Sequence, residues 1–260
     1  MPSRSLFKHD PRRDYGRLAR IGVLTPQANP TVEPELQLLF PAGVSMLTSR
    51  CTSTGEPRQR FLDYFRNMER SLAGFDTLEL DAVAFACTAS SYLLEPGEEE
   101  SECRHLEARF AYPLITAAAA IGQALNFLGA KRIALACPYP DWLHQCSKIY
   151  WQAQGFELVD SISVQPDMGD TRAIYDIRGE EAATLIKSAL KPATADAIVI
   201  TGTGMPALKA LVTLQKQFGI PVFNSNLALA WACLNRLGIP PGNRAADTTF
   251  PLLSGWQAAL

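Results

Sequence analysis

Two short segments of the chain end differently at matching positions, and this difference limits the chemistry available. Residues 81–90 read DAVAFACTAS and residues 196–205 read DAIVITGTGM. When the segments are aligned at their aspartates, Cys87 falls opposite Gly202. A thiol can act as nucleophile, acid or base, whereas glycine has no side chain to offer. We therefore predict one reactive group, Cys87; a buried, inert cysteine is the alternative.

Both segments continue into small residues of the kind that bind anions. If a helix or turn begins after Cys87, its amides and positive end lower the thiol's pKa from the free value of about 8.5. Amides and hydroxyls can also hold a carboxylate or an enolate oxygen. The segment TGTGMP (201–206) is alternatively a tight turn into a helix that begins at Pro206. The predicted anion-binding residues are Thr88, Ala89, Ser90, Thr201, Gly202, Thr203 and Gly204.

Two more polar residues follow predicted strands. Asn29 lies in TPQANPTVEPEL (25–36), and its amide can bind a substrate carboxylate or cap the helix that begins near Pro30. The corresponding segment of the second half, CPYPDW (137–142), offers Tyr139, which can donate to an anion or pack as an aromatic. The apolar side of the pocket has three candidates, which are Tyr92, Leu93 and Trp142.

These residues need a scaffold, and short apolar segments alternate with segments of helical period. Several of the apolar segments are hydrophobic on both faces, as buried parallel strands must be. The alternation predicts an α/β fold with right-handed crossovers. The expected strands are residues 20–26, 44–50, 81–87, 113–117, 132–138, 157–164, 196–202 and 221–226. The expected helices are residues 31–40, 58–77, 99–109, 117–129, 141–154, 171–190, 206–218 and 226–237.

The two halves of the chain resemble each other. RIGVLTP at Arg20 corresponds to RIALACP at Arg132, and AYPLITA (111–117) corresponds to GIPVFNS (219–225). Together with the DAVAFACTAS and DAIVITGTGM pair, these three matches occur in the same order in both halves. This indicates a duplicated unit. We expect two pseudo-symmetric lobes, each a mostly parallel sheet flanked by helices, with the active site in the cleft between them. The predicted parts are an N-terminal arm (1–19), a first lobe (20–117 and 226–260) and a second lobe (118–225).

Composition narrows the classes of partner. The 260 residues carry a net charge of −2, and no long basic block suggests nucleic-acid binding. No apolar run is long enough for a membrane span, and no secretory signal is visible, so we expect a cytoplasmic protein without membrane contact. The six cysteines form no CxxC pair and no cluster with histidine, which predicts free thiols and no metal site.

Several motifs resemble the aspartate/glutamate racemase superfamily, in particular its branch of maleate cis–trans isomerases and arylmalonate decarboxylases. The motifs are NPTVEPE, AFACTAS, PY after the fifth strand, GFELVDSISV and MPAL, and the resemblance runs from about Arg20 to Gly238. It implies two pseudo-symmetric lobes without metal or organic cofactor, and commonly a homo-oligomer. It also implies that Asn29 and Tyr139 hold the substrate's carboxylate and that Thr88 belongs to the oxyanion-binding loop.

The same resemblance implies that the number of cysteines in the site separates the family's activities. The family's racemases and isomerases have two cysteines that face each other across the substrate, whereas its arylmalonate decarboxylases have one cysteine and one glycine. Here Cys87 occupies the first position and Gly202 the second. Gly202 supplies neither acid nor base, and the hydroxyl of Thr201 or Thr203 is a poor base near neutral pH, so a two-base racemase is disfavoured.

We therefore predict a cofactor-independent lyase on a small dicarboxylic, malonate-like or arylmalonate-like acid. Decarboxylation or proton transfer would pass through an enolate-like intermediate to which Cys87 delivers a proton. Because the known decarboxylases carry glycine first and cysteine second, the product should have the opposite handedness. The alternatives are a maleate-type cis–trans isomerase with Cys87 as covalent nucleophile, an Asp/Glu-type racemase, and a non-catalytic carboxylate-binding protein.

Overall fold

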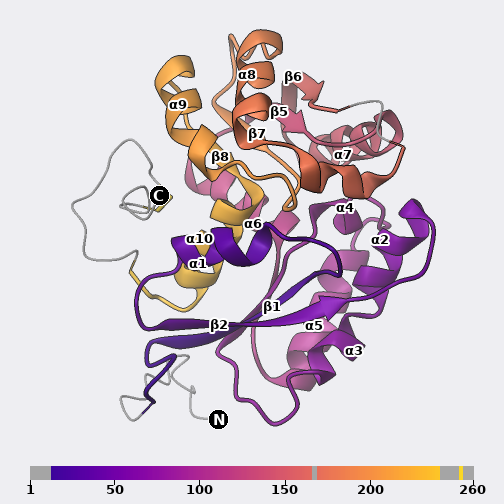
Figure 1. Cartoon of the computed structure of the whole chain (residues 1–260), viewed down its shortest axis with the longest axis vertical. Coiled ribbons are helices and arrows are strands. Elements are labelled where there is room, and N and C mark those ends of the chain that lie inside the picture. Colours follow the sequence, from indigo (N-terminus) through magenta and orange to yellow (C-terminus); the bar gives the residue numbers. More distant parts are fainter. Residues whose placement is uncertain (1–12, 166–168, 241–251, 254–260) are drawn as a thin grey trace.

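The computed structural model describes residues 13–165, 169–240, 252 and 253. Over these residues, two four-stranded parallel sheets lie one above the other, each with helices packed on it (Figure 1). This confirms the predicted α/β class and the two lobes. Most of the N-terminal arm, residues 1–12, and most of the tail after Pro240 lie outside the described residues.

The two sheets repeat the same spatial order. The first sheet runs β2-β1-β3-β4 and the second β6-β5-β7-β8, so each strand of the first lobe has its counterpart four strands later. The predicted duplication is therefore visible in the topology, and all eight expected strands form. The strands are β1 (Ala19–Pro26), β2 (Val44–Cys51), β3 (Ala82–Phe85), β4 (Leu114–Thr116), β5 (Arg132–Cys137), β6 (Glu157–Ser163), β7 (Ala197–Ile200) and β8 (Val222–Asn224).

The repeated aspartates of the opening segments have a structural role. Asp81 accepts a hydrogen bond from the backbone N–H of Arg20 at 2.8 Å, and Asp196 accepts one from the N–H of Arg132, also at 2.8 Å. Asp81 thus fixes the start of β1 beside β3, and Asp196 fixes the start of β5 beside β7. The likeness between the halves therefore extends to individual hydrogen bonds.

Eleven helices, one of them a 3-10 helix (η1), connect these strands in the described part of the chain. They are α1 (Val32–Leu39), α2 (Pro57–Arg66), α3 (Met68–Ala73), α4 (Thr88–Ser91), α5 (Glu98–Phe110), α6 (Ala117–Phe127), α7 (Asp141–Ala153), η1 (Thr171–Asp176), α8 (Gly179–Ala189), α9 (Leu208–Phe218) and α10 (Ser225–Arg236). No helix among them is both long and apolar enough to cross a bilayer.

Two of the expected helices are each divided in two. The segment 58–77 breaks at Asn67, whose backbone leaves the helical region (φ −102°, ψ 19°), and gives α2 and α3. The segment 171–190 breaks at Ile177 and Arg178, which are extended, and gives η1 and α8. The second break matters for function because it frees η1 to lie between the lobes.

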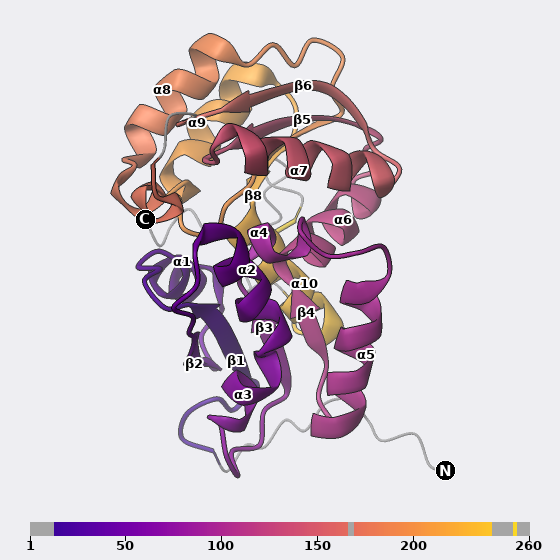
Figure 2. The same cartoon turned by 90° about the vertical axis from the view of Figure 1, so that its right-hand side faces the viewer.

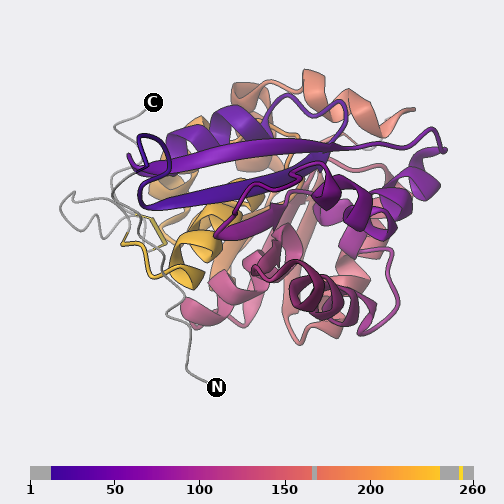
Figure 3. The same ribbon diagram turned by 90° about the horizontal axis from the view of Figure 1, so that it is seen from below.

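Helix α10 ties the end of the described chain back to its beginning. It packs against α6 and α1 and also contacts β3, β4 and β8 (Figure 2). Viewed from below, the long strands β1 and β2 lie side by side at one edge of the first sheet, with the yellow α10 nearby (Figure 3). The exact boundaries of the two lobes stay a prediction.

Candidate active site

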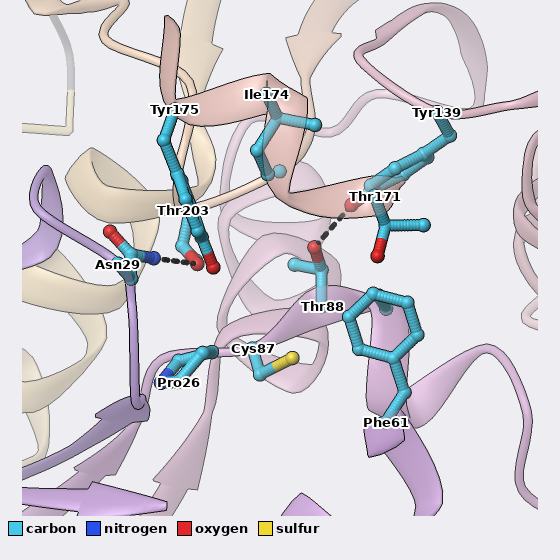
Figure 4. Close-up of a pocket in the computed structure, with 13 residues that line it drawn as sticks. Pro26, Asn29, Phe61, Cys87, Thr88, Tyr139, Thr171, Ile174, Tyr175 and Thr203 are labelled. Atoms are coloured by element: carbon cyan, nitrogen blue, oxygen red, sulfur yellow. Dashed lines mark hydrogen bonds between the residues drawn. The ribbon is translucent and has the colours of Figure 1, made fainter. Parts of the chain in front are cut away.

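A small cavity lies where the carboxyl ends of β1, β3, β5 and β7 meet between the lobes. Its free volume is about 20 Å³, enough for about one water molecule. Parallel α/β sheets place their ligands at these strand ends, because the loops there converge. Figure 4 shows its walls. The lining residues are Pro26, Asn29, Phe61, Cys87, Thr88, Ala89, Tyr139, Thr171, Ile174, Tyr175, Gly202, Thr203 and Gly204.

Cys87 stands between β3 and α4, at the floor of this cavity. Only 3% of the residue is exposed, so its sulfur is reached through the cavity alone. The Ser90 hydroxyl lies 3.2 Å from Cys87 Sγ and 2.7 Å from the carbonyl oxygen of Phe61, and its single hydrogen can be donated to either. The backbone N–H groups of Ala89 and Ser90 act on the sulfur as well and favour its charged form. A thiolate formed here would therefore be stabilised by these amides and could also accept from the Ser90 hydroxyl.

The expected lowering of the Cys87 pKa is wrong. Burial raises the pKa of the thiol, and the hydrogen bonds from Ser90 and Ala89 oppose the rise without cancelling it. Helix α4 is only four residues long, so its dipole adds little. Cys87 is therefore a protonated thiol at neutral pH before a ligand binds.

Thr88 and Tyr139 close the cavity from opposite lobes. The hydroxyl of Thr88 lies 2.7 Å from the phenol oxygen of Tyr139, within hydrogen-bond distance (Figure 4). Burial raises the pKa of Tyr139, so its phenol keeps its proton and remains a donor. A ligand that inserts between the two hydroxyls would receive a hydrogen bond from each lobe.

Of the two roles that the sequence left open for Asn29, the structural one at the start of α1 is seen, and binding of a substrate carboxylate stays a prediction. Its Oδ1 accepts from the N–H of Thr31 at 2.9 Å and from that of Val32 at 3.2 Å, which caps α1. Its Nδ2 donates to Thr203 Oγ1 at 3.3 Å across the lobes, and Thr203 Oγ1 donates to the Ala86 carbonyl at 2.8 Å. The cap fixes the amide so that its donor faces the cavity.

Gly202 is a glycine for a local reason. Its φ is +87°, in the left-handed region, and a Cβ there would lie 2.5 Å from Pro138 Cγ. No thiol other than Cys87 lines the described cavity, so nothing comparable to Cys87 faces it. Gly204 is constrained by space alone, because a Cβ would lie 2.5 Å from Tyr175 Cε1.

Two of the sequence-predicted residues do not line the cavity. Thr201 is fully buried, and its hydroxyl has no hydrogen-bond partner among the described residues. It is therefore placed too deep to replace the missing second cysteine. Ser90 lies behind Cys87 and acts on the sulfur rather than on a ligand.

The apolar wall comes from residues that sequence reasoning missed. Phe61 belongs to α2, and Ile174 and Tyr175 belong to η1. The earlier candidates lie elsewhere: Tyr92 packs edge-to-face on the far side of Tyr139, and neither Leu93 nor Trp142 reaches the cavity. The sequence predicted helices over both segments but gave no sign that they line the site, because neither segment belongs to the repeated motifs.

Among the described residues that line the cavity there is no lysine, arginine or histidine, so these would hold an anion through neutral donors. Hydroxyl and amide groups can do this where they are buried and fixed, because electrostatic interactions strengthen when water is excluded. Within the described residues, no group of three or more His, Cys, Asp or Glu side chains could hold a metal ion.

A family model described as arylmalonate decarboxylase matches residues 21–250. Because this match spans most of the sequence, the chain belongs to that family. The resemblance to the maleate isomerase and arylmalonate decarboxylase branch of the superfamily is thereby confirmed. The chain is accordingly an enzyme of the isomerase or lyase type found in this superfamily.

The individual relatives include maleate isomerases and an arylmalonate decarboxylase. A maleate isomerase of Geobacillus stearothermophilus is 28% identical over 85% of this chain and 92% of its own length. One solved structure is a maleate cis–trans isomerase of Nocardia farcinica, a cysteine-to-serine mutant with a covalently bound succinylcysteine intermediate. It has a TM-score of 0.72 at 24% identity, and the match covers 85% of this chain and 94% of that one. A liganded arylmalonate decarboxylase mutant, with one glycine changed to cysteine and one cysteine to serine, has a TM-score of 0.77 at 18% identity, covering 91% and 99%.

Proposed function

We propose that this enzyme isomerises the double bond of a small cis-dicarboxylic acid of the maleate type, with Cys87 as the covalent nucleophile. The observation that carries the proposal is the position of Cys87, the single thiol in the described lining of a cavity whose polar donors come from both lobes. The maleate isomerase relatives, one of them with a succinylcysteine intermediate, support it. The proposal prefers isomerisation to the decarboxylation that the sequence favoured.

The reaction balances without a second acid. The Cys87 thiol first gives its proton to water. The thiolate forms a C–S bond to one alkene carbon, and the π pair moves onto the neighbouring carboxylate as an enolate-like anion. Rotation about the carbon–carbon single bond then brings the two carboxylates to opposite sides. The electron pair returns to re-form the alkene, the C–S bond breaks, and the released thiolate takes its proton back from water. No proton is needed from the face occupied by Gly202.

The surrounding groups suit the two charges that develop. The Ala89 and Ser90 amides stabilise the departing thiolate. Asn29 and Tyr139 supply neutral donors for the carboxylate that takes up the enolate charge. Losing one oxyanion donor of this kind typically costs about 2.7–4 kcal/mol of barrier. These donors bind protein partners, Thr203 and Thr88, so the substrate must displace those contacts.

Cavity size also favours a small substrate. The free volume of about 20 Å³ holds little more than one water molecule, so any substrate must displace the walls. A four-carbon diacid requires less displacement than a larger acid. An arylmalonate would require Phe61, Ile174 and Tyr175 to move apart.

Decarboxylation of a malonate-type acid is the second candidate, and the protonated state of Cys87 favours it. One C–C bond breaks, carbon dioxide leaves, and the electron pair remains on the other carboxylate as an enolate-like anion. The Cys87 S–H then protonates the carbon, and water returns the proton to sulfur. With the thiol in the first lobe, the product from a prochiral arylmalonate should be of opposite handedness to that of the decarboxylases with a second-lobe cysteine.

The experiment is to incubate the purified protein separately with maleate, phenylmalonate, aspartate and glutamate in D₂O and to follow each by proton NMR. We expect fumarate from maleate, no carbon dioxide, and no product from a Cys87→Ala control. Loss of carbon dioxide from phenylmalonate with maleate untouched would select the second candidate. Deuterium exchange at the α-carbon of an amino acid would indicate a racemase. No turnover, with Cys87→Ser binding maleate as tightly as wild type, would indicate a binding protein.

A further inference from the structure

The wall of the cavity opposite Cys87 is built by the short helix η1. Thr171, Ile174 and Tyr175 all point from it toward the floor that carries the thiol (Figure 4). The 3-10 helix belongs to the second half of the chain and follows β6, but the cavity it covers opens onto residues of the first half. What holds η1 in place therefore determines the shape of the site.

A buried arginine from the other lobe holds the first turn of η1. Arg60 lies on α2, its side chain is 6% exposed, and its Nη2 donates to Asp170 Oδ1 at 3.1 Å and to Thr171 Oγ1 at 2.8 Å. Asp170 in turn accepts from the N–H of Arg172 at 2.9 Å and so caps η1. Hydrogen bonds from a charged donor are stronger than neutral ones, and burial protects them from water.

The contact with Arg60 also orients the Thr171 hydroxyl. A hydroxyl has one hydrogen to donate and two lone pairs that accept. Because Thr171 Oγ1 accepts from the guanidinium, its own hydrogen is free for another partner, and Thr171 lines the cavity. Arg60 therefore leaves Thr171 able to donate to a bound anion and places a positive charge directly behind it.

We propose that Arg60 is a positioning residue that fixes η1 over the cavity and turns Thr171 into a donor for the substrate's second carboxylate. The proposal rests on the proposed function in taking a small dicarboxylate as the ligand and Cys87 as the reacting group. In this proposal Thr171, on η1 of the second lobe, binds one carboxylate, and Arg60 of the first lobe holds Thr171 in position.

The first test measures how accessible Cys87 is to a small reagent and needs no substrate. Arg60→Met keeps the apolar stem of the side chain and removes both hydrogen bonds. We expect iodoacetamide to alkylate Cys87 at least about fivefold faster in this variant, measured on the Cys87 peptide by mass spectrometry. Arg66→Met is the matched control: it lies on the same helix, is 53% exposed and pairs with Glu98 away from the cavity. Its rate should equal that of wild type.

The second test separates positioning from general destabilisation. With maleate, Arg60→Met should raise KM at least about tenfold while kcat changes less, since each tenfold in binding is about 1.4 kcal/mol. Thr171→Val, which keeps the shape and loses the donor, should raise KM similarly, and Arg60→Lys should restore part of the loss. Thermal melts of each variant identify any that fail to fold, in which case Thr171→Val alone decides.

The outcomes are distinct from those of the proposed function. Wild-type alkylation rates in Arg60→Met together with an unchanged KM in Thr171→Val would overturn the role of Arg60. If maleate is not a substrate, the alkylation test still decides whether Arg60 closes the cavity, and fumarate formation alone decides the activity.

Discussion

The hydroxyl of Thr88 lies 2.7 Å from the phenol oxygen of Tyr139, so the residue after Cys87 is hydrogen-bonded to the opposite lobe. The two hydroxyls satisfy each other. A carboxylate that enters between them replaces one neutral contact by two hydrogen bonds to an ion, which are the stronger kind. This exchange offsets part of the cost of removing the anion from water.

Removing the Tyr139 hydroxyl should therefore weaken catalysis more than folding. We expect Tyr139→Phe to lower kcat/KM for maleate by about 10²–10³-fold, the range for loss of one oxyanion donor. Steady-state kinetics of fumarate formation measures it. Tyr150→Phe is the control, because Tyr150 belongs to the same aromatic cluster but donates to Glu99 outside the cavity. Equal losses in both variants would show that the hydroxyl of Tyr139 has no special role.

The raised pKa of Cys87 predicts the pH dependence and separates the two candidate reactions. Burial raises the pKa of the thiol, which leaves less thiolate at any given pH. If the thiolate is the nucleophile, kcat/KM for maleate should climb with pH through neutrality and beyond about 8.5, the value for free cysteine. If the thiol is a proton donor, the rate with phenylmalonate should be level near neutrality and fall at high pH.

The measurement is a pH–rate profile for each substrate, with the pH dependence of iodoacetamide alkylation at Cys87 as an independent titration of the same group. The two midpoints should agree and lie above the free value. An alkylation midpoint below about 8.5 would show that the hydrogen bonds from Ser90 and Ala89 outweigh burial.

The sequence predicted the scaffold well because the scaffold depends on local patterns. Each strand is a short apolar run bounded by turn residues, and the repeated aspartates Asp81 and Asp196 mark the same backbone contact in both sheets. Since the carboxyl ends of parallel strands converge, Asn29, Cys87, Tyr139 and Gly202 were expected around one cleft because each follows a matching strand of two similar halves. Tertiary contacts were not needed to expect it.

The rest of the site depends on contacts between segments far apart in the chain. Phe61 and η1 come to the cavity from different halves of the chain, where Arg60 and Asp170 bind each other, and nothing in either local sequence indicates that pair. The direction of the Cys87 pKa shift failed for a related reason. A strand end can be open or buried, and only the packing of the second lobe settles how little water reaches the sulfur.

The glycine at position 202 should be hard to replace. Gly202→Ala places a Cβ 2.5 Å from Pro138 Cγ at a φ of +87°, so we expect a loss of about 1–3 kcal/mol from the backbone and a similar loss from overpacking. Urea unfolding measures it. Adding Pro138→Ala should recover the overpacking part only.

Gly122→Ala is the matched control for this prediction. Gly122 lies within α6, and a Cβ there meets no atom within 4 Å, so the change should stabilise the helix by about 0.5–1 kcal/mol. If Gly202→Ala caused no loss of stability, the absence of a second cysteine at this position would have no steric basis in this chain. Installing a thiol there would then become a practical route to a two-cysteine site.

A buried carboxylate fixes the other side of the cleft. Glu35 is 7% exposed; its Oε1 accepts from the N–H groups of Ala207 (2.9 Å) and Leu208 (3.2 Å), and its Oε2 accepts from the amides of Asn224 (2.9 Å) and Asn226 (2.8 Å). Asn226 also donates to the carbonyl of Thr203 at 3.0 Å. Glu35, in the first lobe, thus holds the loop that carries Thr203 in the second.

Replacing Glu35 by Gln keeps the shape but turns one acceptor into an N–H₂ donor that faces two other donors. We expect a loss of about 1–3 kcal/mol for each donor left without an acceptor, measured by urea unfolding. Glu33→Gln, on the same helix and partly exposed in an ion pair with Arg50, should cost no more than about 1 kcal/mol. Because Thr203 shares its hydroxyl with Asn29, Glu35→Gln should also raise KM, whereas Glu33→Gln should leave the Thr203 contacts intact. Equal stability losses in the two variants would mean that the four hydrogen bonds to Glu35 contribute no more than an exposed ion pair.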